Sequence, residues 1–236
     1  MPFLRKKKPK KKNQPTDASA SPTQASQETI ESIIKDNPSL HRRPDGSPWF
    51  LGISGQTFKT IIDLLEPGMN TIETGAGFSS LAFILKGTNH RAVCPDRYLE
   101  DNIRTWCDSQ RLDHSKFTFV AERSQDFLPN LDDDLDFALI DGDHAFPIPM
   151  IDYYYIARRL SVGGFLAIDD CNLWTGDVIV KNLMMDSAWE FYSEHHGRTV
   201  IFRRTAPWQD GTVGSQPYLL ANSRGLPSYF YDDLKK

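Results

Sequence analysis

The stretch TIETGAGFSSLAF, residues 71–83, decides how the chain around it folds. Apolar and β-branched residues lead into the carboxylate of Glu73, which precedes two glycines, Gly75 and Gly77. Two serines then open a second apolar run. This order predicts a buried strand that turns sharply into a helix, since glycines allow tight turns and serines favour the first positions of helices.

A turn of this kind is a common place for a ligand. In an open parallel sheet, ligands bind beyond the carboxyl ends of the strands, and the following helix offers free N–H groups. Ser79 and Ser80 are the N-cap candidates. A dinucleotide turn, G-x-G-x-x-G/A, would place glycine or alanine where Ser80 stands. Glu73 also suits a ligand with a cationic end better than a pyrophosphate. A tight turn without any ligand is the alternative.

The length and composition indicate a soluble globular chain. Its 236 residues are enough for one domain, residues 26–236, with a core at about 50–204 and a C-terminal extension at 205–236. No apolar run approaches the roughly 18 residues of a membrane span. The three cysteines are widely spaced, which argues against a disulfide framework and favours a reducing compartment, the cytoplasm.

The charge is divided between a basic start and an acidic body. Residues 1–12 hold seven Lys and Arg and no acid, so the rest has 20 basic and 31 acidic residues. With the polar segment that follows, residues 1–25 are predicted to be a disordered basic tail. Such a tail suits an anionic partner: a nucleic acid, a membrane surface or the receptor for a nuclear address. A merely solvated tail is the alternative.

The body alternates between predicted strands and helices. Near-continuous apolar strands are expected at 69–74, 90–95, 116–121, 135–141 and 164–170, with a helical pattern between each pair of neighbours. This order predicts an α/β, Rossmann-like, doubly wound fold with helices on both faces of a seven-stranded, mainly parallel sheet. Residues 188–204 read as two strands about a turn near Gly197, which predicts an antiparallel hairpin at one edge.

Three blocks of this sequence together resemble a known family. E-T-G-A-G-F-S-S, then DFALIDGDHAF, then LSVGGFLAIDD resemble motifs of class I S-adenosylmethionine-dependent methyltransferases. The second block resembles the branch with I-D-G-D-H at the end of the fourth strand, which includes sugar- and antibiotic-tailoring O-methyltransferases and, more distantly, the catechol type. The resemblance covers roughly residues 50–204 and implies S-adenosylmethionine as the cofactor.

The resemblance implies which residues hold the cofactor. Glu73, Gly75 and Gly77 would surround its methionine part, with the carboxylate near the ammonium group. The family places an acid that binds the ribose where this chain has Cys94, so Asp96 is the substitute. The remaining cofactor-binding candidates are Ser79, Ser124, Gln125 and Asp141. Helix capping is the alternative for Asp96 and Ser124.

Acidic residues end the two strands where the chemistry is expected. Asp141 and Asp143 follow one strand, and Asp169 and Asp170 follow the next. Four crowded carboxylates need a cation, protonation or diverging directions. In the catechol type an Asp and an Asp-Asn pair hold magnesium, which implies a Mg²⁺ site at Asp141, Asp169 and Asp170. Asp143 is an alternative to Asp141, and loop capping without metal is an alternative to the whole site.

The same resemblance places a basic side chain at His144, which implies a general base for an acceptor hydroxyl. The function expected is therefore methyl transfer to the hydroxyl of a small molecule, with magnesium as a candidate assistant. Trp174 is a candidate wall of the acceptor pocket. Two other functions stay open: a non-catalytic or nucleic-acid-directed module that acts through the basic tail, and an NAD(P)-dependent oxidoreductase.

Overall fold

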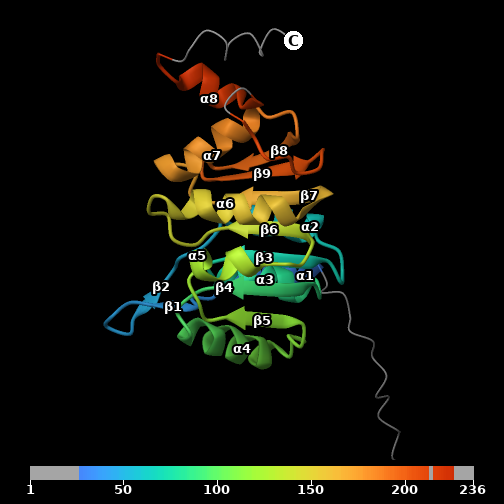
Figure 1. Cartoon of the computed structure of the whole chain (residues 1–236). Helices are drawn as coiled ribbons and strands as arrows, with labels where there is room; N and C mark the ends of the chain where they lie inside the picture. The colour runs from blue at the N-terminus through green and yellow to red at the C-terminus, as the bar shows by residue number, and fades with distance from the viewer. Residues whose placement is uncertain (1–26, 213–214, 226–236) are drawn as a thin grey trace, which may run out of the picture.

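A computed structural model describes residues 27–212 and 215–225 of the chain (Figure 1). The predicted basic tail, residues 1–25, lies outside the described residues, as do residues 26, 213–214 and 226–236. The strands are β1 (His41–Arg42), β2 (Pro48–Trp49), β3 (Asn70–Thr74), β4 (Asn89–Val93), β5 (Phe117–Val120), β6 (Leu135–Ile140), β7 (Leu160–Ile168), β8 (Trp189–His195) and β9 (Thr199–Arg204). The helices are α1 (Gln27–Asp36), α2 (Gly55–Leu64), α3 (Phe78–Leu85), α4 (Tyr98–Gln110), α5 (Ser124–Phe127), the 3₁₀ helix η1 (Leu128–Asn130), α6 (Ile148–Arg159), α7 (Trp174–Met184) and α8 (Pro217–Asn222).

The main sheet has seven strands in the order β5-β4-β3-β6-β7-β9-β8. The first five are parallel to one another, while β9 pairs antiparallel with both β7 and β8. The predicted fold class, a mainly parallel seven-stranded sheet with an antiparallel edge hairpin, is confirmed. A second, two-stranded sheet of β1 and β2 was not predicted, because strands of two residues leave no alternation to detect.

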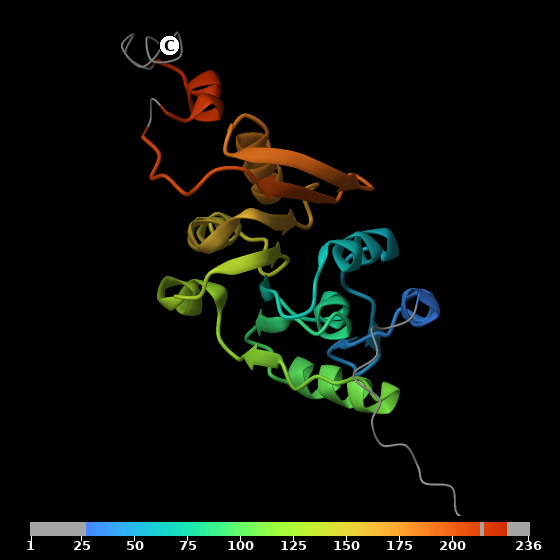
Figure 2. The ribbon, with the colours of Figure 1, turned by 90° about the vertical axis from the view of Figure 1, so that its right-hand side faces the viewer.

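Helices cover both faces of the sheet, and each face has its own core (Figure 2). Along β6, Phe137 and Leu139 belong to the core under α2, α3 and α4, whereas Ala138 and Ile140 belong to the core under α6 and α7. The strand is therefore buried on both sides, as expected for a parallel sheet between helical layers. This explains why its sequence reads as one apolar run.

The register brings the ends of four strands to the same level. Thr74 of β3 pairs with Val93 of β4 and with Ile140 of β6, and Ile140 pairs with Ile168 of β7. The next residue along each strand therefore stands in one row across the sheet. That row is Cys94, Gly75, Asp141 and Asp169.

The segment before the main sheet lies against the core with α2 and α3. Ile30 and Ile33 of α1 and Leu40 just before β1 are buried there. The β1–β2 hairpin projects at the left of Figure 1, on the side to which the chain emerges from β3. Within the described residues, no helix has the length and apolar character needed to cross a membrane.

Candidate active site

A cavity of about 620 Å³ opens where the strands end. Most of the residues singled out from the sequence line it: Gly75, Gly77, Ser79, Asp96, Ser124, Gln125, Asp141 and His144, together with Asp170. Glu73 and Asp169 do not line this cavity. The row of strand ends thus forms a single pocket, in which the glycine turn and the carboxylates face the same space.

The glycine turn is built for close backbone approach. Gly75 has a φ of +89°, and a Cβ atom there would lie 2.3 Å from the carbonyl oxygen of Asp141. A Cβ atom on Gly77 would lie 2.7 Å from Nε2 of His41. The first contact is with backbone, so Gly75 has no room for a side chain, whereas the second is with the end of the His41 side chain, which would have to shift. The turn therefore fits glycine at Gly75 and leaves its backbone open to the cavity.

Glu73 lies beneath this turn rather than in the cavity. Its carboxylate is fully buried and accepts hydrogen bonds from Ser79 Oγ at 2.6 Å and from Ser80 Oγ, while His90 Nε2 lies 3.1 Å from Oε1. Ser80 Oγ also accepts the N–H of Gly77, which is the N-cap of α3. The expectation of a serine N-cap is therefore wrong, because the serines of this helix bind the carboxylate that precedes the turn.

The wall next to β4 departs from the pattern of the family. Cys94 stands level with Gly75 and is buried, and this burial raises the pKa of its thiol to about 11. The thiol is therefore neutral near pH 7. Asp96, two residues on, lines the cavity and is exposed. Asp96 thus offers the carboxylate on this side, which agrees with its choice as the substitute for Cys94.

A buried carboxylate close to Ser124, which lines the cavity, was not predicted. Asp152 of α6 is 0% exposed, and neither of its oxygens has a partner of hydrogen-bonding geometry among the described residues. The hydroxyls of Ser124 and Thr74 lie near it, and Thr74 Oγ1 is also unsatisfied among these residues. Burial raises the pKa of Asp152 to about 6. The signal in the sequence was weak: one acid in the apolar, aromatic run MIDYYY.

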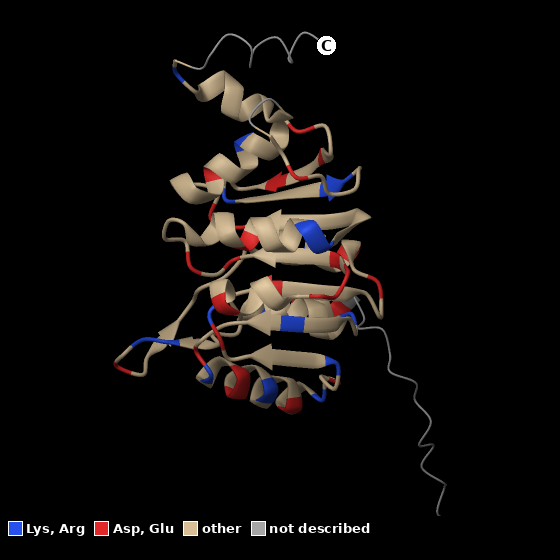
Figure 3. Cartoon of the chain, in the orientation of Figure 1, with Lys and Arg blue, Asp and Glu red and all other residues tan. Residues whose placement is uncertain are grey.

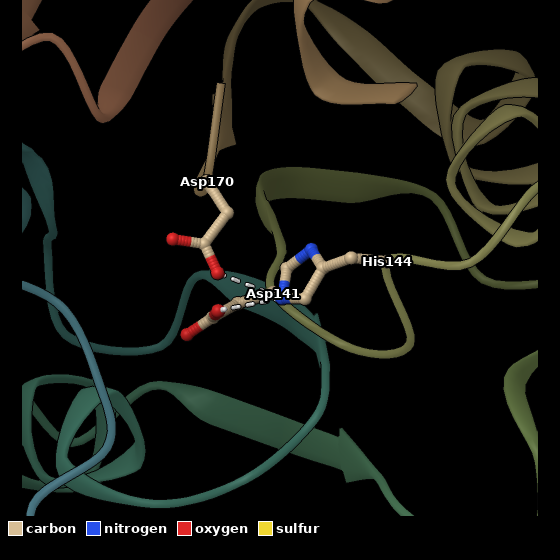
Figure 4. A group of neighbouring side chains, drawn as sticks. All are labelled: Asp141, His144 and Asp170. Atoms are coloured by element: carbon tan, nitrogen blue, oxygen red, sulfur yellow. Dashed lines mark ion pairs between the residues drawn. The ribbon is translucent and has the colours of Figure 1, made fainter. Parts of the chain in front are cut away.

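Asp141, His144 and Asp170 meet at the other end of the cavity (Figure 4). Nε2 of His144 lies 3.0 Å from Oδ2 of Asp170 and 3.9 Å from Oδ1 of Asp141. Burial, followed by the negative charges of Asp169, Glu73 and Asp170, raises the pKa of Asp141 well above its usual range. Three ligand atoms of Asp141, His144 and Asp170 lie within 4.8 Å of one another, so this group can hold a metal ion.

The geometry corrects the predicted metal set at Asp169. Its side chain is fully buried and points away from the cavity, toward Arg198 Nη2 at 2.9 Å and the hydroxyl of Thr199, which donates to it. Successive side chains alternate along a strand, so Asp169 follows the face of Ala167 into the core under α2. Asp170 comes after the strand has ended, at a φ of +51°, and faces His144 instead.

Arg198 is another residue of this site that the sequence did not reveal. It comes from the turn between β8 and β9, and its Nε lies 2.7 Å from Oδ1 of Asp170. The antiparallel pairing of β9 with β7 carries it to Asp169 and Asp170. An arginine in a predicted hairpin turn gives no signal of such a partner. Its charge offsets part of the carboxylate crowding that the sequence predicted.

The chain is similar to known proteins in a sequence profile and in its fold. Residues 72–171 match a protein-family profile described as "Methyltransferase domain". The structure is similar to that of the O-methyltransferase TomG from Streptomyces achromogenes, involved in tomaymycin synthesis and solved with S-adenosylmethionine, at 16% identity and a TM-score of 0.59, covering 74% of this chain and 90% of TomG. No curated protein matches the sequence.

Two further similar structures are described as an O-methyltransferase and as an rRNA methylase. The O-methyltransferase NovP has 16% identity and a TM-score of 0.58, covering 75% of this chain and 98% of its own. An rRNA methylase from Streptococcus thermophilus has 12% identity and a TM-score of 0.51, covering 70% and 98%. The predicted resemblance to class I S-adenosylmethionine-dependent methyltransferases is confirmed at the level of domain and fold. The I-D-G-D-H branch stays a prediction.

Proposed function

We propose that this chain, which has a methyltransferase domain on a class I fold, transfers a methyl group from S-adenosylmethionine to the hydroxyl of a small molecule. The observation that carries the proposal is the position of His144. Nε2 of its imidazole faces the carboxylates of Asp170 and Asp141 in the same cavity that the glycine turn opens onto. A positioned base beside a cofactor cavity is what methylation of a hydroxyl requires.

The described residues fit the cofactor in shape and in chemistry. The turn has no room for a Cβ atom at Gly75, and one at Gly77 would displace His41, so glycine leaves the backbone free to approach a ligand. Ser124 and Gln125 supply polar groups for a base, and Asp96 supplies a carboxylate for ribose hydroxyls. Glu73 acts through the turn, because both of its oxygens are already occupied by Ser79, Ser80 and His90.

The chain contributes a base, charge balance and positioning. When bound, S-adenosylmethionine supplies a methyl group on a sulfonium sulfur. His144 holds Nε2 against Asp170, so Nδ1, the ring nitrogen directed away from the carboxylates, takes the proton of the acceptor hydroxyl (Figure 4). The bound cofactor would give its methyl group to the acceptor oxygen and would be left as a thioether. Asp141 and Asp170 stabilise the imidazolium that results.

A divalent cation is the second candidate for promoting methyl transfer at this site. The ligand atoms of Asp141, His144 and Asp170 are close enough together to hold one, and the set is rich in oxygen. Arg198 weakens this proposal, because its guanidinium already lies 2.7 Å from Asp170. A cation bound to Nε2 would also compete with Asp170 for this nitrogen. The metal set we propose is therefore Asp141, His144 and Asp170, with Asp169 removed.

The test is methyl transfer to a panel of phenols, hydroxylated sugars and small metabolites, with product mass as the readout. His144→Ala should lower turnover by about 10²–10⁴-fold, the usual contribution of a positioned base. Its affinity for S-adenosylhomocysteine should stay near that of the wild type. His196→Asn, an exposed histidine in the β8–β9 turn, is the matched control.

The same assay distinguishes the contribution of a divalent cation from that of the general base, His144. Full activity in a chelator would exclude the metal and leave the base in place. Unchanged turnover in His144→Ala would overturn the assignment of the base. Transfer to RNA but to no small acceptor would overturn the substrate class, and the rRNA methylase of similar fold makes RNA the second acceptor to include.

A further inference from the structure

The cofactor pocket lacks one group where its ribose is expected. The strand end that usually carries an acid carries Cys94, whose thiol is neutral near pH 7 because burial raises its pKa to about 11. A thiol is a weak donor and a weak acceptor. Two adjacent ribose hydroxyls need stronger partners, and Asp96 is one carboxylate for two hydroxyls.

His41 lies at this part of the cavity, although it precedes Cys94 by more than fifty residues. It belongs to the β1–β2 hairpin and lines the cavity together with Gly77 and Asp96. Its Nε2 lies so close to the glycine turn that a Cβ atom on Gly77 would be only 2.7 Å away. His41 is therefore packed onto the turn, on the side that faces the end of β4.

The hairpin is fixed in this position by several contacts. Leu40 is buried in the core, and its carbonyl accepts a hydrogen bond from Asn102 Nδ2 of α4 at 2.8 Å. Ser39 Oγ ties the two strands together by donating to the carbonyl of Trp49 at 3.0 Å. Tyr98, at the start of α4, lies near the backbone of Arg42. These contacts fix the chain on either side of His41 without help from a ligand.

We propose that His41 and Asp96 together hold the two ribose hydroxyls of the cofactor, in place of the acid that is missing at Cys94. The inference rests on the proposed function, because it takes S-adenosylmethionine as the ligand. Asp96 accepts from one hydroxyl, and the imidazole of His41 bonds to the other. The N-terminal hairpin, which precedes the matched methyltransferase domain, thereby becomes part of the cofactor site.

The chemistry of His41 suits a hydroxyl. Burial lowers its pKa, although the backbone of Ala76 and the charges of Asp96 and Glu73 act in the opposite direction. A neutral imidazole has one donor and one acceptor, which are the two functions that a hydroxyl can pair with. A strong cation at this position would instead bind Asp96 and remove the carboxylate from the ribose.

The test compares two ligands by calorimetry: S-adenosylhomocysteine and its 2′,3′-dideoxy analogue. His41→Ala and His41→Phe should each weaken S-adenosylhomocysteine by roughly fivefold to tenfold, the usual contribution of one hydrogen bond. Asp96→Asn should weaken it by about tenfold or more, since its hydrogen bond is charged. None of the three variants should weaken the dideoxy analogue further.

Two comparisons make the result decisive. His41→Phe keeps a ring against Gly77 and removes its nitrogens, so it separates hydrogen bonding from packing of the hairpin. Arg43→Ala removes an exposed charge from the same hairpin and should leave both affinities unchanged. Figure 3 shows where Lys and Arg, in blue, occur along this hairpin. An equal loss for both ligands, or no loss for either, in His41→Phe would overturn the role of His41. If wild-type protein binds neither ligand, the cofactor itself is wrong, and the proposed function fails with the inference.

Discussion

The end of β3 and the ends of β6 and β7 both present acids at the same edge of the sheet, yet the two regions differ in every other respect. Glu73, the acid of β3, is fully buried. Its carboxylate is bonded to Ser79 and Ser80 of α3 and lies next to His90 of β4. Asp141 and Asp170 have side chains that are 15% and 22% exposed and face His144 across the cavity. The first region holds the turn together, and the second is open to a ligand.

Within the second region, two adjacent residues repeat the contrast. Asp169 is fully buried against Thr199 and Arg198, whereas Asp170 faces the cavity. Arg198 contacts both, so one guanidinium joins an inner and an outer carboxylate. The position of an acid at a strand end therefore does not decide its role. The role of the acid depends on the direction of its side chain relative to the sheet and on the groups that this side chain contacts.

The largest expected effect tests the inner region at Glu73. Glu73→Ala leaves the hydroxyls of Ser79 and Ser80 and the ring of His90 without their shared acceptor. Breaking a buried charged network of this kind costs about 3–5 kcal/mol of unfolding free energy. Urea denaturation followed by circular dichroism measures this loss.

The matched control for Glu73 is Glu66→Ala, which removes an exposed acid just after α2 and should change stability by less than about 0.5 kcal/mol. A loss below about 1 kcal/mol in Glu73→Ala would remove the distinction between inner and outer acids. Glu73 would then be free to contact the cofactor directly, as the sequence alone predicted.

The next effect is a gain in stability, and it depends on pH. Asp152 is buried without hydrogen-bond partners among the described residues, and its pKa is raised to about 6 by burial. An acid with a raised pKa in the folded state destabilises the fold as pH rises from about 4 to about 6, and the full cost persists above that. Asp152→Asn removes the charge, so at pH 7 it should stabilise the protein by about 3 kcal/mol.

The pH profile separates this effect from a change in packing. The difference in unfolding free energy between Asp152→Asn and the wild type should be near zero at pH 4 and should grow up to about pH 6. Urea titrations at half-unit steps between pH 4 and pH 7 measure it. A difference that stays constant over this range would show that the charge of Asp152 is not the cause.

The sequence predicted more of the fold than of the site, for a physical reason. The alternation of strands and helices follows from apolar runs separated by helical patterns, and each run is a local property of the chain. The direction of Asp169 was not readable, because the strand before it is apolar on both faces and only the structure shows that Ala167 faces the core under α2. The partners were not readable. Arg198 reaches Asp169 across 29 residues, and His41 reaches Gly77 through a hairpin whose strands are only two residues long.

The smallest expected change in stability is at the outer region, at Asp170. Its side chain is partly exposed, and the ion pair with Arg198 forms near solvent, where such pairs contribute less than about 1 kcal/mol. Its φ of +51° lies in the left-handed region, which asparagine tolerates well. Asp170→Asn should therefore stay within about 1 kcal/mol of the wild type. Its turnover should nevertheless fall by roughly tenfold or more, because His144 loses the carboxylate that supports it as a base.

Asp169→Asn should show the reverse pattern, in which stability falls more than turnover does. About 1.5–3 kcal/mol should be lost from the charged hydrogen bonds of the buried side chain. Paired denaturation and methyl-transfer assays on the two variants measure both quantities. If Asp170→Asn were the less stable variant and Asp169→Asn the less active one per folded molecule, the inner and outer roles would have to be exchanged.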